Sequence, residues 1–201
     1  MGDKEWIQKE YLPKLKGKIL YVGVMTKDDY CKYTQTPETF ETMDIDINVK
    51  KGISPYKHHI CDFLDFKNEY KYDHISLHGL WGENVYFMNK GKENPTESRL
   101  EATKTIISII DKANDMLNVE GTLQIGPNTE LLDINGVYKT FMDDIYNYLE
   151  DNIYQQIYRN RPKILGNINY IFWGKKKKNK KFDYKNNNLW EIIKTVGLFK
   201  L

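Results

Sequence analysis

Short apolar runs that end in glycine or acid recur along the first third of the chain. The first of them, Lys18 to Val24, is continuous, as in strands that are covered on both faces of a parallel sheet. Three similar runs follow at 40–47, 57–61 and 72–77. Between them lie connections that are polar or broken by Gly and Pro, such as Thr36-Pro37. This pattern predicts four strands of a parallel sheet, beginning with a β-α-β unit.

Longer segments place their apolar residues at helical spacing. They predict helices from about Asp3 to Leu15, from Thr96 to about Leu117 and from Asn135 to about Ile157. A turn at Val119 to Gly121 should lead into a fifth strand, 122–126, which Pro127 ends. Further segments predict a strand at 164–173, a short helix at 189–196 and an edge strand at 197–201. The whole is a single α/β domain, residues 1–201, with a mostly parallel central sheet and helices on both faces.

Composition supports a globular protein. The chain has 201 residues, of which 40% are hydrophobic and 29% charged. No apolar run approaches the roughly 20 residues that cross a bilayer, and the first residues lack the apolar region of a signal peptide. We therefore expect a soluble cytoplasmic protein that makes no membrane contact.

Basic residues are unevenly chosen and placed. The formal charge is only +2, and Arg99, Arg159 and Arg161 are the only arginines among 30 basic residues. That bias is typical of AT-rich genomes, such as those of some viruses and parasites. The run Lys175 to Lys181 could contact the phosphates of a nucleic acid or form a solvated hairpin tip. The two cysteines lie far apart without ligand-like spacing, so neither a disulfide nor a zinc site is predicted.

The strand ends carry the residues that could bind a nucleotide-like ligand. Gly23 lacks a side chain, so the backbone can approach a ligand there. Asp44 ends the second strand with a carboxylate that can accept from both hydroxyls of a ribose. Asp62 can accept from an adenine amino group, with Phe63 beside the ring. Ligands of open α/β sheets bind at this edge, so the loop after Leu77 should lie near the reacting group.

These motifs resemble those of the class I S-adenosylmethionine (SAM)-dependent methyltransferases, which have a Rossmann-like fold. The resemblance rests on Ile19-Leu-Tyr-Val-Gly23, Thr42-Met-Asp-Ile-Asp46, His59-Ile-Cys-Asp62 and Tyr72-Asp-His-Ile-Ser-Leu-His-Gly-Leu-Trp-Gly82. It implies SAM as the cofactor and transfer of its methyl group to an acceptor that the motifs do not identify. It places Gly23 and Val24 at the methionine moiety, Asp44 at the ribose, Asp62 and Phe63 at the adenine, and His78 and Gly79 in the loop beside the methyl donor. Ile45, next to Asp44, is a further candidate for cofactor binding.

The sequence also departs from that family. Gly23 is followed by Val24-Met25-Thr26 where a Gly-x-Gly-x-Gly turn is usual, and His78 stands where Asn or Asp is more familiar. An Asn/Asp-Pro-Pro-aromatic motif is missing, which disfavours methylation of a base amino group, and so is the Lys-Asp-Lys-Glu set of ribose 2′-O enzymes. An inactive binding or scaffold protein that contacts RNA or a protein is therefore the alternative. A dinucleotide oxidoreductase is disfavoured, since Gly-x-Gly-x-x-Gly is absent.

Histidines invite two further hypotheses. His78 is the candidate catalytic residue, because an imidazole at this strand end titrates near neutrality and can act as a general base. His58, His59, His74 and His78 could in principle bind a metal. Alternate strand residues point to opposite faces and no acid or cysteine completes a set, so no metal is predicted.

Overall fold

The computed structural model describes residues 15–23, 40–45, 57–77, 95–129, 146–147, 149–151, 153–160, 163–164 and 167–177. Their strands are β1 (Ile19–Val22), β2 (Phe40–Asp44), β3 (Lys57–Ile60), β4 (Tyr72–Leu77), β5 (Leu117–Thr129), β6 (Tyr154–Asn160), β7 (Lys163–Ile164) and β8 (Asn167–Lys176). One helix has both ends described, α3 (Pro95–Met116).

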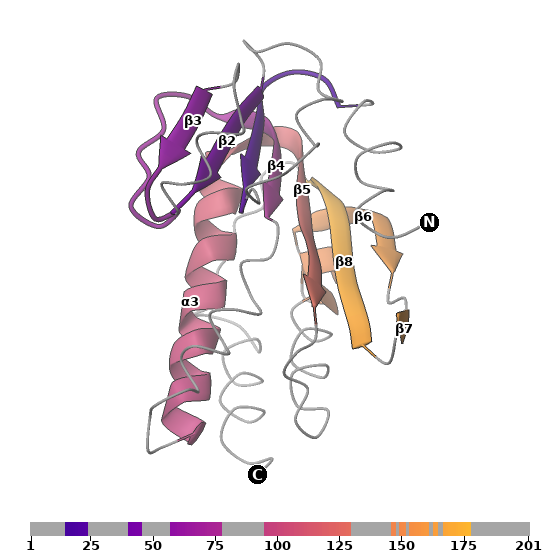
Figure 1. The fold of residues 1–201 in the computed structure, drawn as a ribbon. Coiled ribbons are helices and arrows are strands. Elements are labelled where there is room, and N and C mark those ends of the chain that lie inside the picture. The colour runs from indigo at the N-terminus through magenta and orange to yellow at the C-terminus, as the bar shows by residue number, and fades with distance from the viewer. Residues whose placement is uncertain are drawn as a thin grey trace.

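Seven strands form one sheet in the order β3-β2-β1-β4-β5-β8-β6, and β7 pairs with β8 (Figure 1). The first five strands of this order run parallel, and β8 is antiparallel to both β5 and β6. The order reverses at β1, because the chain moves outward to β2 and β3 and then returns to add β4 on the other side. This is the Rossmann-like, mostly parallel α/β fold that the sequence predicts, and ligands of such sheets bind at the reversal point.

Apolar side chains of the sheet and α3 form the described core. α3 lies along one face of the sheet (Figure 1). Leu20, Met43 and Ile75 point from three strands into the cluster that contains Ile110 and Ala113 of α3, and all five are fully buried. Each buried aliphatic side chain contributes about 1.5–3 kcal/mol. This face is therefore a dry core, which fixes the strands that carry the candidate site.

The fifth strand differs from the prediction at both ends. It begins at Leu117, directly after α3, so the predicted turn at 119–121 is wrong. The strand bulges there: β4 has one residue between its partners of Leu117 and Thr122, whereas β5 has four, and Glu120 adopts a φ of 66°. Pro127 does not end the strand either. It lies where pairing with β8 shifts register, an irregularity that tolerates a residue without an N–H.

The segment after residue 145 also differs. The predicted helix 135–157 is too long, because the helical residues described here end at Asp151 and β6 begins at Tyr154. Ile153 lies between the helical residues and β6. It fits the helical spacing because it is buried, and its N–H still donates to the Leu149 carbonyl at 2.9 Å. The strand predicted at 164–173 is β8, which starts at Asn167 and continues through Lys176 into the basic run.

Other predictions lie outside the described residues. They are the helices at 3–15 and 189–196, the loop after Gly79 and the edge strand at 197–201. The four parallel strands predicted first are confirmed, with β4 at the predicted bounds. No helix in the described part of the chain is long and apolar enough to cross a membrane.

Candidate functional site

The strand register brings the predicted binding residues to one edge of the sheet. Val22 pairs with Met43 of β2 and with Leu77 of β4, so the residues that follow all three lie at the same level. The ladder continues one step further, because the Gly23 N–H donates to the Met43 carbonyl at 2.9 Å. Gly23 and Asp44 are thus neighbours at the carboxyl ends of adjacent parallel strands, beside the reversal of strand order.

Gly23 has the backbone conformation that its candidate role needs. Its φ is 82°, in the left-handed region that favours glycine. Gly126 is its counterpart after Ile125, the partner of Leu77, and has a φ of 98°. Gly126 was not predicted as a site residue, although it is the last residue of the predicted fifth strand and lies within β5. Two glycines with positive φ therefore lie at the same level of the sheet, where the backbone can approach a ligand closely.

Acidic and apolar side chains alternate at the ends of β2 and β3. Asp44 is partly exposed, and the next residue, Ile45, exposes 70% of its surface. The Asp44 carbonyl accepts from the N–H of Cys61, which joins the end of β2 to the start of the next predicted motif. An exposed isoleucine beside a carboxylate offers an apolar surface to a flat ring and an acceptor to its polar groups.

The predicted adenine residues begin the β3–β4 connection, residues 61–71. Asp62 is exposed, and its Oδ1 accepts from the N–H of Leu64 at 2.8 Å, which closes a tight turn. Phe63 points the other way and is 5% exposed within the core. Leu64, which the sequence analysis passed over, exposes 36% of its surface in the same turn. The structure thus presents Asp62 and Leu64 outward and uses Phe63 as an anchor.

Three predicted site residues lie outside the described residues: Val24, His78 and Gly79. The structure places only the residues before them, Gly23 and Leu77, at the edge of the sheet. Their roles stay predictions.

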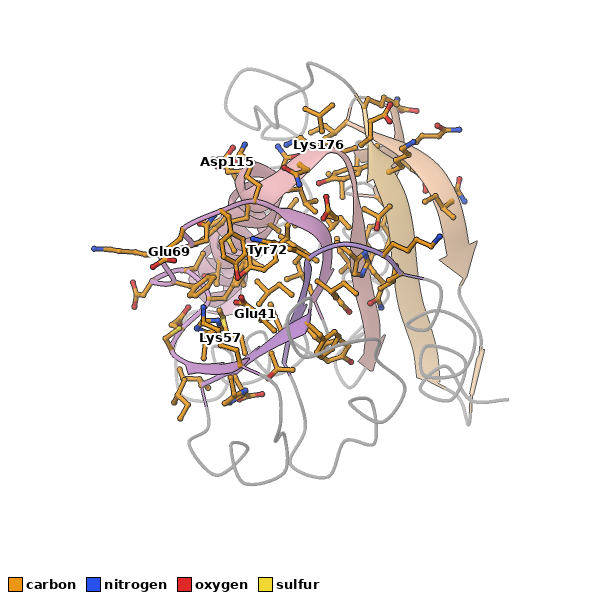
Figure 2. The ribbon with its side chains drawn as sticks, turned by 90° about the horizontal axis from the view of Figure 1, so that it is seen from above. Glu41, Lys57, Glu69, Tyr72, Asp115 and Lys176 are labelled. Atoms are coloured by element: carbon orange, nitrogen blue, oxygen red, sulfur yellow. The ribbon has the colours of Figure 1, made fainter. Side chains whose placement is uncertain are left out.

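A polar cluster around Glu41 was not predicted. The Glu41 side chain is buried in β2, and its oxygens accept from the hydroxyls of Tyr70 and Tyr72, the latter at 2.9 Å. His59 Nε2 lies 2.7 Å from Glu41 Oε2, and Lys57 Nζ lies 3.6 Å from Oε1. Figure 2 shows Glu41, Lys57 and Tyr72 gathered on the β3 side of the sheet. A charged residue between the apolar residues Phe40 and Met43 of a predicted strand was the signal that could have found it.

The described histidines have structural partners on both faces of the sheet. His59 bonds to Glu41, His58 Nδ1 lies 2.8 Å from the Thr42 hydroxyl, and His74 Nδ1 lies 2.5 Å from that of Thr122. Burial lowers the pKa of His74 to about 3, so its imidazole is neutral. Within the described ranges, His, Cys, Asp and Glu do not gather in groups of three that could hold a metal ion.

The described part of the basic run is engaged in structure. Lys176 is buried, and its ammonium donates to the carbonyls of Asn114 and Leu117 at 2.6 and 3.4 Å, at the end of α3. Lys177 donates to the carbonyls of Glu150 and Asp151 at 2.8 and 3.1 Å. Cations favour these positions, because the carbonyls that end a helix lack partners and carry partial negative charge. These two lysines serve the fold, which the sequence analysis did not anticipate.

Comparison with known proteins identifies the fold. No family model and no curated protein matches the sequence. Among solved structures, magnesium protoporphyrin IX methyltransferase (ChlM) from Synechocystis PCC 6803 with bound SAM is similar, with a TM-score of 0.55 and 12% identity over 87% of this chain and 76% of that one. N-methyltransferase NodS from Bradyrhizobium japonicum WM9 gives 0.54 and 11% over 81% and 86%. An rRNA methylase from Streptococcus thermophilus gives 0.51 and 11% over 81% and 88%.

The chain therefore has the Rossmann-like fold of the class I SAM-dependent methyltransferases. The resemblance noted in the sequence motifs is confirmed at the level of the fold.

Proposed function

We propose that the protein is a SAM-dependent methyltransferase whose cofactor binds at the carboxyl edge of β1, β2 and β3. The proposal rests on one observation: Gly23, which has a φ of 82°, lies next to Asp44 where the order of the strands reverses. A methionine chain would cross the backbone at Gly23, and both ribose hydroxyls would donate to Asp44. Exposed Ile45, together with Asp62, would hold the adenine. That neighbours of this fold hold SAM supports the assignment.

Methyl transfer needs little help from acids and bases. A nucleophilic atom of the acceptor attacks the methyl carbon, the carbon–sulfur bond breaks, and S-adenosylhomocysteine (SAH) leaves with the electron pair. The chief task of the protein is to hold the acceptor in line with that bond. We assign to His78 the role of the general base that takes the acceptor's proton, and we place the backbone of Gly79 beside the methyl group. Both residues follow Leu77 in the chain, at the edge of the sheet.

The neighbours differ in their acceptors, since their names include an rRNA methylase and a magnesium protoporphyrin IX methyltransferase. The fold alone therefore selects no acceptor. An inactive scaffold remains the second candidate, because Val24-Met25-Thr26 replaces the usual glycine turn. Nucleic-acid binding by the basic run is less favoured, as Lys176 and Lys177 already bond to carbonyl groups.

Calorimetric titration with SAM and SAH tests the proposal. We expect Asp44→Ala to weaken SAH binding about a hundredfold or more, because two hydrogen bonds to a charged group are lost. Asp115→Ala is the matched control: this exposed carboxylate lies near the end of α3, beside the amino ends of the parallel strands (Figure 2). Absence of binding to the wild-type protein would refute the methyltransferase and favour the scaffold, whereas equal binding by Asp44→Ala would refute the assigned pocket.

The assignment of His78 has a test of its own. His78→Asn should bind SAH as the wild type does but lose turnover with any acceptor that the wild type methylates. A variant that keeps its turnover would exclude His78 as the base.

A further inference from the structure

The carboxylate of Glu41 lies at the centre of a buried network. Glu41 is the second residue of β2, pairs with Leu20 and Lys57 in the ladder, and is 6% exposed. A carboxylate removed from water destabilises the fold unless hydrogen bonds and charges compensate. Here Oε1 receives Tyr70 and Lys57, and Oε2 receives Tyr72 and His59. One carboxylate therefore joins β3, the β3–β4 connection and β4.

Two tyrosines tie down the far end of that connection. Tyr70 is near its last residue and Tyr72 is the first residue of β4, and their rings meet edge to face at 5.4 Å. Burial, together with the hydrogen bond and charge of Glu41, raises the pKa of Tyr72 far above its usual range. Its hydroxyl consequently stays protonated and donates. Lys18 adds a cation 3.3 Å from the centre of the Tyr70 ring.

His59 extends the network to the middle of the connection. Its imidazole, held by Glu41, contacts the ring of Phe66 with centroids 4.7 Å apart. The N–H of Asp65 donates to the Asp62 carbonyl at 3.1 Å and that of Phe66 to the Phe63 carbonyl at 3.3 Å, so Phe66 ends two overlapping turns, the first of which begins at Asp62. The charge of Glu41 thereby acts, through one imidazole and one phenyl ring, on the segment that presents Asp62.

The near end of the connection is held from α3. The ammonium of Lys112 donates to the Leu64 carbonyl and lies 6.0 Å from the centre of the Phe63 ring. Asp62 itself is exposed and accepts from the Leu64 N–H. Its carboxylate direction is thus set by a turn that is fixed through Phe63 and Lys112 on one side and through Phe66 on the other.

We infer that Glu41 is a positioning residue for purine recognition: it fixes the β3–β4 connection so that Asp62 accepts from the amino group at C6 of adenine. The inference rests on the proposed function and adds a determinant of specificity. Asp62 rejects a purine that has a carbonyl group at C6. The carboxylate and the carbonyl oxygen are both hydrogen-bond acceptors, so no hydrogen bond can form between them. Glu41 has no contact with the ligand in this arrangement and acts only through the connection.

The discrimination between SAH and S-inosyl-L-homocysteine, which has a carbonyl in place of the C6 amino group, reports on this role. We expect the wild type to bind SAH at least about tenfold more tightly, as befits one hydrogen bond to a charged acceptor. Glu41→Gln keeps the size of the side chain but loses its charge, and should reduce the preference to less than about threefold. In Asp62→Ala the preference should be lost, and adding Glu41→Gln should reduce it no further.

Thr122→Val controls for a general loss of stability. It removes the hydroxyl partner of His74 on the opposite face of the sheet, and its preference for SAH should equal that of the wild type. Should Glu41→Gln fail to fold, Tyr70→Phe removes one half-buried hydroxyl from the same carboxylate and should still lower the preference.

The outcomes separate the two claims. A Glu41→Gln protein, or in its place Tyr70→Phe, that keeps the full preference makes the network merely structural and overturns the inference. A wild type that binds both ligands equally also overturns it, while leaving SAM binding intact. A wild type that binds neither ligand overturns the proposed function, and the inference with it.

Discussion

The buried imidazole of His74 should make the protein less stable as the pH falls through the weakly acidic range. His74 lies in β4, 1% exposed, and burial lowers its pKa to about 3. In the unfolded chain the same group titrates near about 6.5. Below that pH the unfolded state binds a proton that the folded state does not, so acid favours unfolding. The stabilisation is complete above about pH 6.5 and disappears as the pH approaches 3.

The size of the effect follows from the two pKa values. Over most of this range stability falls by about 1.4 kcal/mol for each pH unit. Between about pH 7.5 and about pH 5, the loss from His74 alone amounts to roughly 2 kcal/mol. It is smaller than the full slope would give, because His74 of the unfolded chain is mostly neutral until the pH falls to about 6.5. A loss of that size is a large fraction of the stability of a typical domain.

Urea unfolding of the wild type, His74→Phe and His74→Gln at both pH values isolates this contribution. Phe keeps a ring at this position but cannot make the hydrogen bond to the Thr122 hydroxyl, whereas Gln can still make it. Both variants differ from the wild type in stability at neutral pH, but neither titrates here. Each should therefore lose roughly 2 kcal/mol less than the wild type on acidification. The reasoning would be refuted if the wild type and the variants lost the same stability on acidification. It would also be refuted if the His74 imidazole of the folded protein titrated near its ordinary pKa.

Two further substitutions test the fold around the site. Gly17→Ala should lower the melting temperature by roughly 2–8 °C, because Gly17 has a φ of 84° and an added Cβ would collide with the carboxylate of Asp73; an unchanged melting temperature would contradict this. Lys176→Met should destabilise the protein by about 1–3 kcal/mol in urea unfolding, since the carbonyls at the end of α3 lose a charged donor. Lys175→Met removes only the exposed pair with Glu120 and should cost less than about 1 kcal/mol; equal losses would refute the capping role.

The parallel strands were predictable because their physics is local. A strand covered on both faces is apolar at every position, and Leu20, Val22 and Met43 belong to such runs. The residues that end these strands follow the same logic, because a chain leaving a buried strand meets water. The sequence pattern alone therefore places Gly23 and Asp44 at the edge of the sheet, and the register confirms that they are neighbours.

The bulge in β5 could not be predicted in this way. Gly121 indicated a turn, yet it is needed for close packing: an added Cβ would lie 2.9 Å from the Asn118 carbonyl oxygen and 3.1 Å from that of Asp73. Only the pairing with β4 shows which of the two uses of glycine applies. The strand at Tyr154 was missed for a similar reason, since a residue buried at a helix end fits both periodicities.

The network around Glu41 depends on contacts between distant residues. His59 lies 18 residues from Glu41 in sequence, Tyr70 29 and Tyr72 31. Each alone is an ordinary polar or aromatic residue of a strand or loop. Their association follows from the pairing of β2 with β3 and from the path of the connection, which the sequence pattern does not specify.

The position of β8 between β5 and β6 also determines the order in which the sheet can be completed during synthesis. β6 leaves the ribosome before β8, but within the described sheet it pairs with β8 and with no other strand. Until residues up to Lys176 have emerged, the long strand β5 is an open edge of the nascent sheet. That edge can pair with a strand from another chain, so slow translation of the last third of the protein should promote aggregation and insertion of β8 should end it.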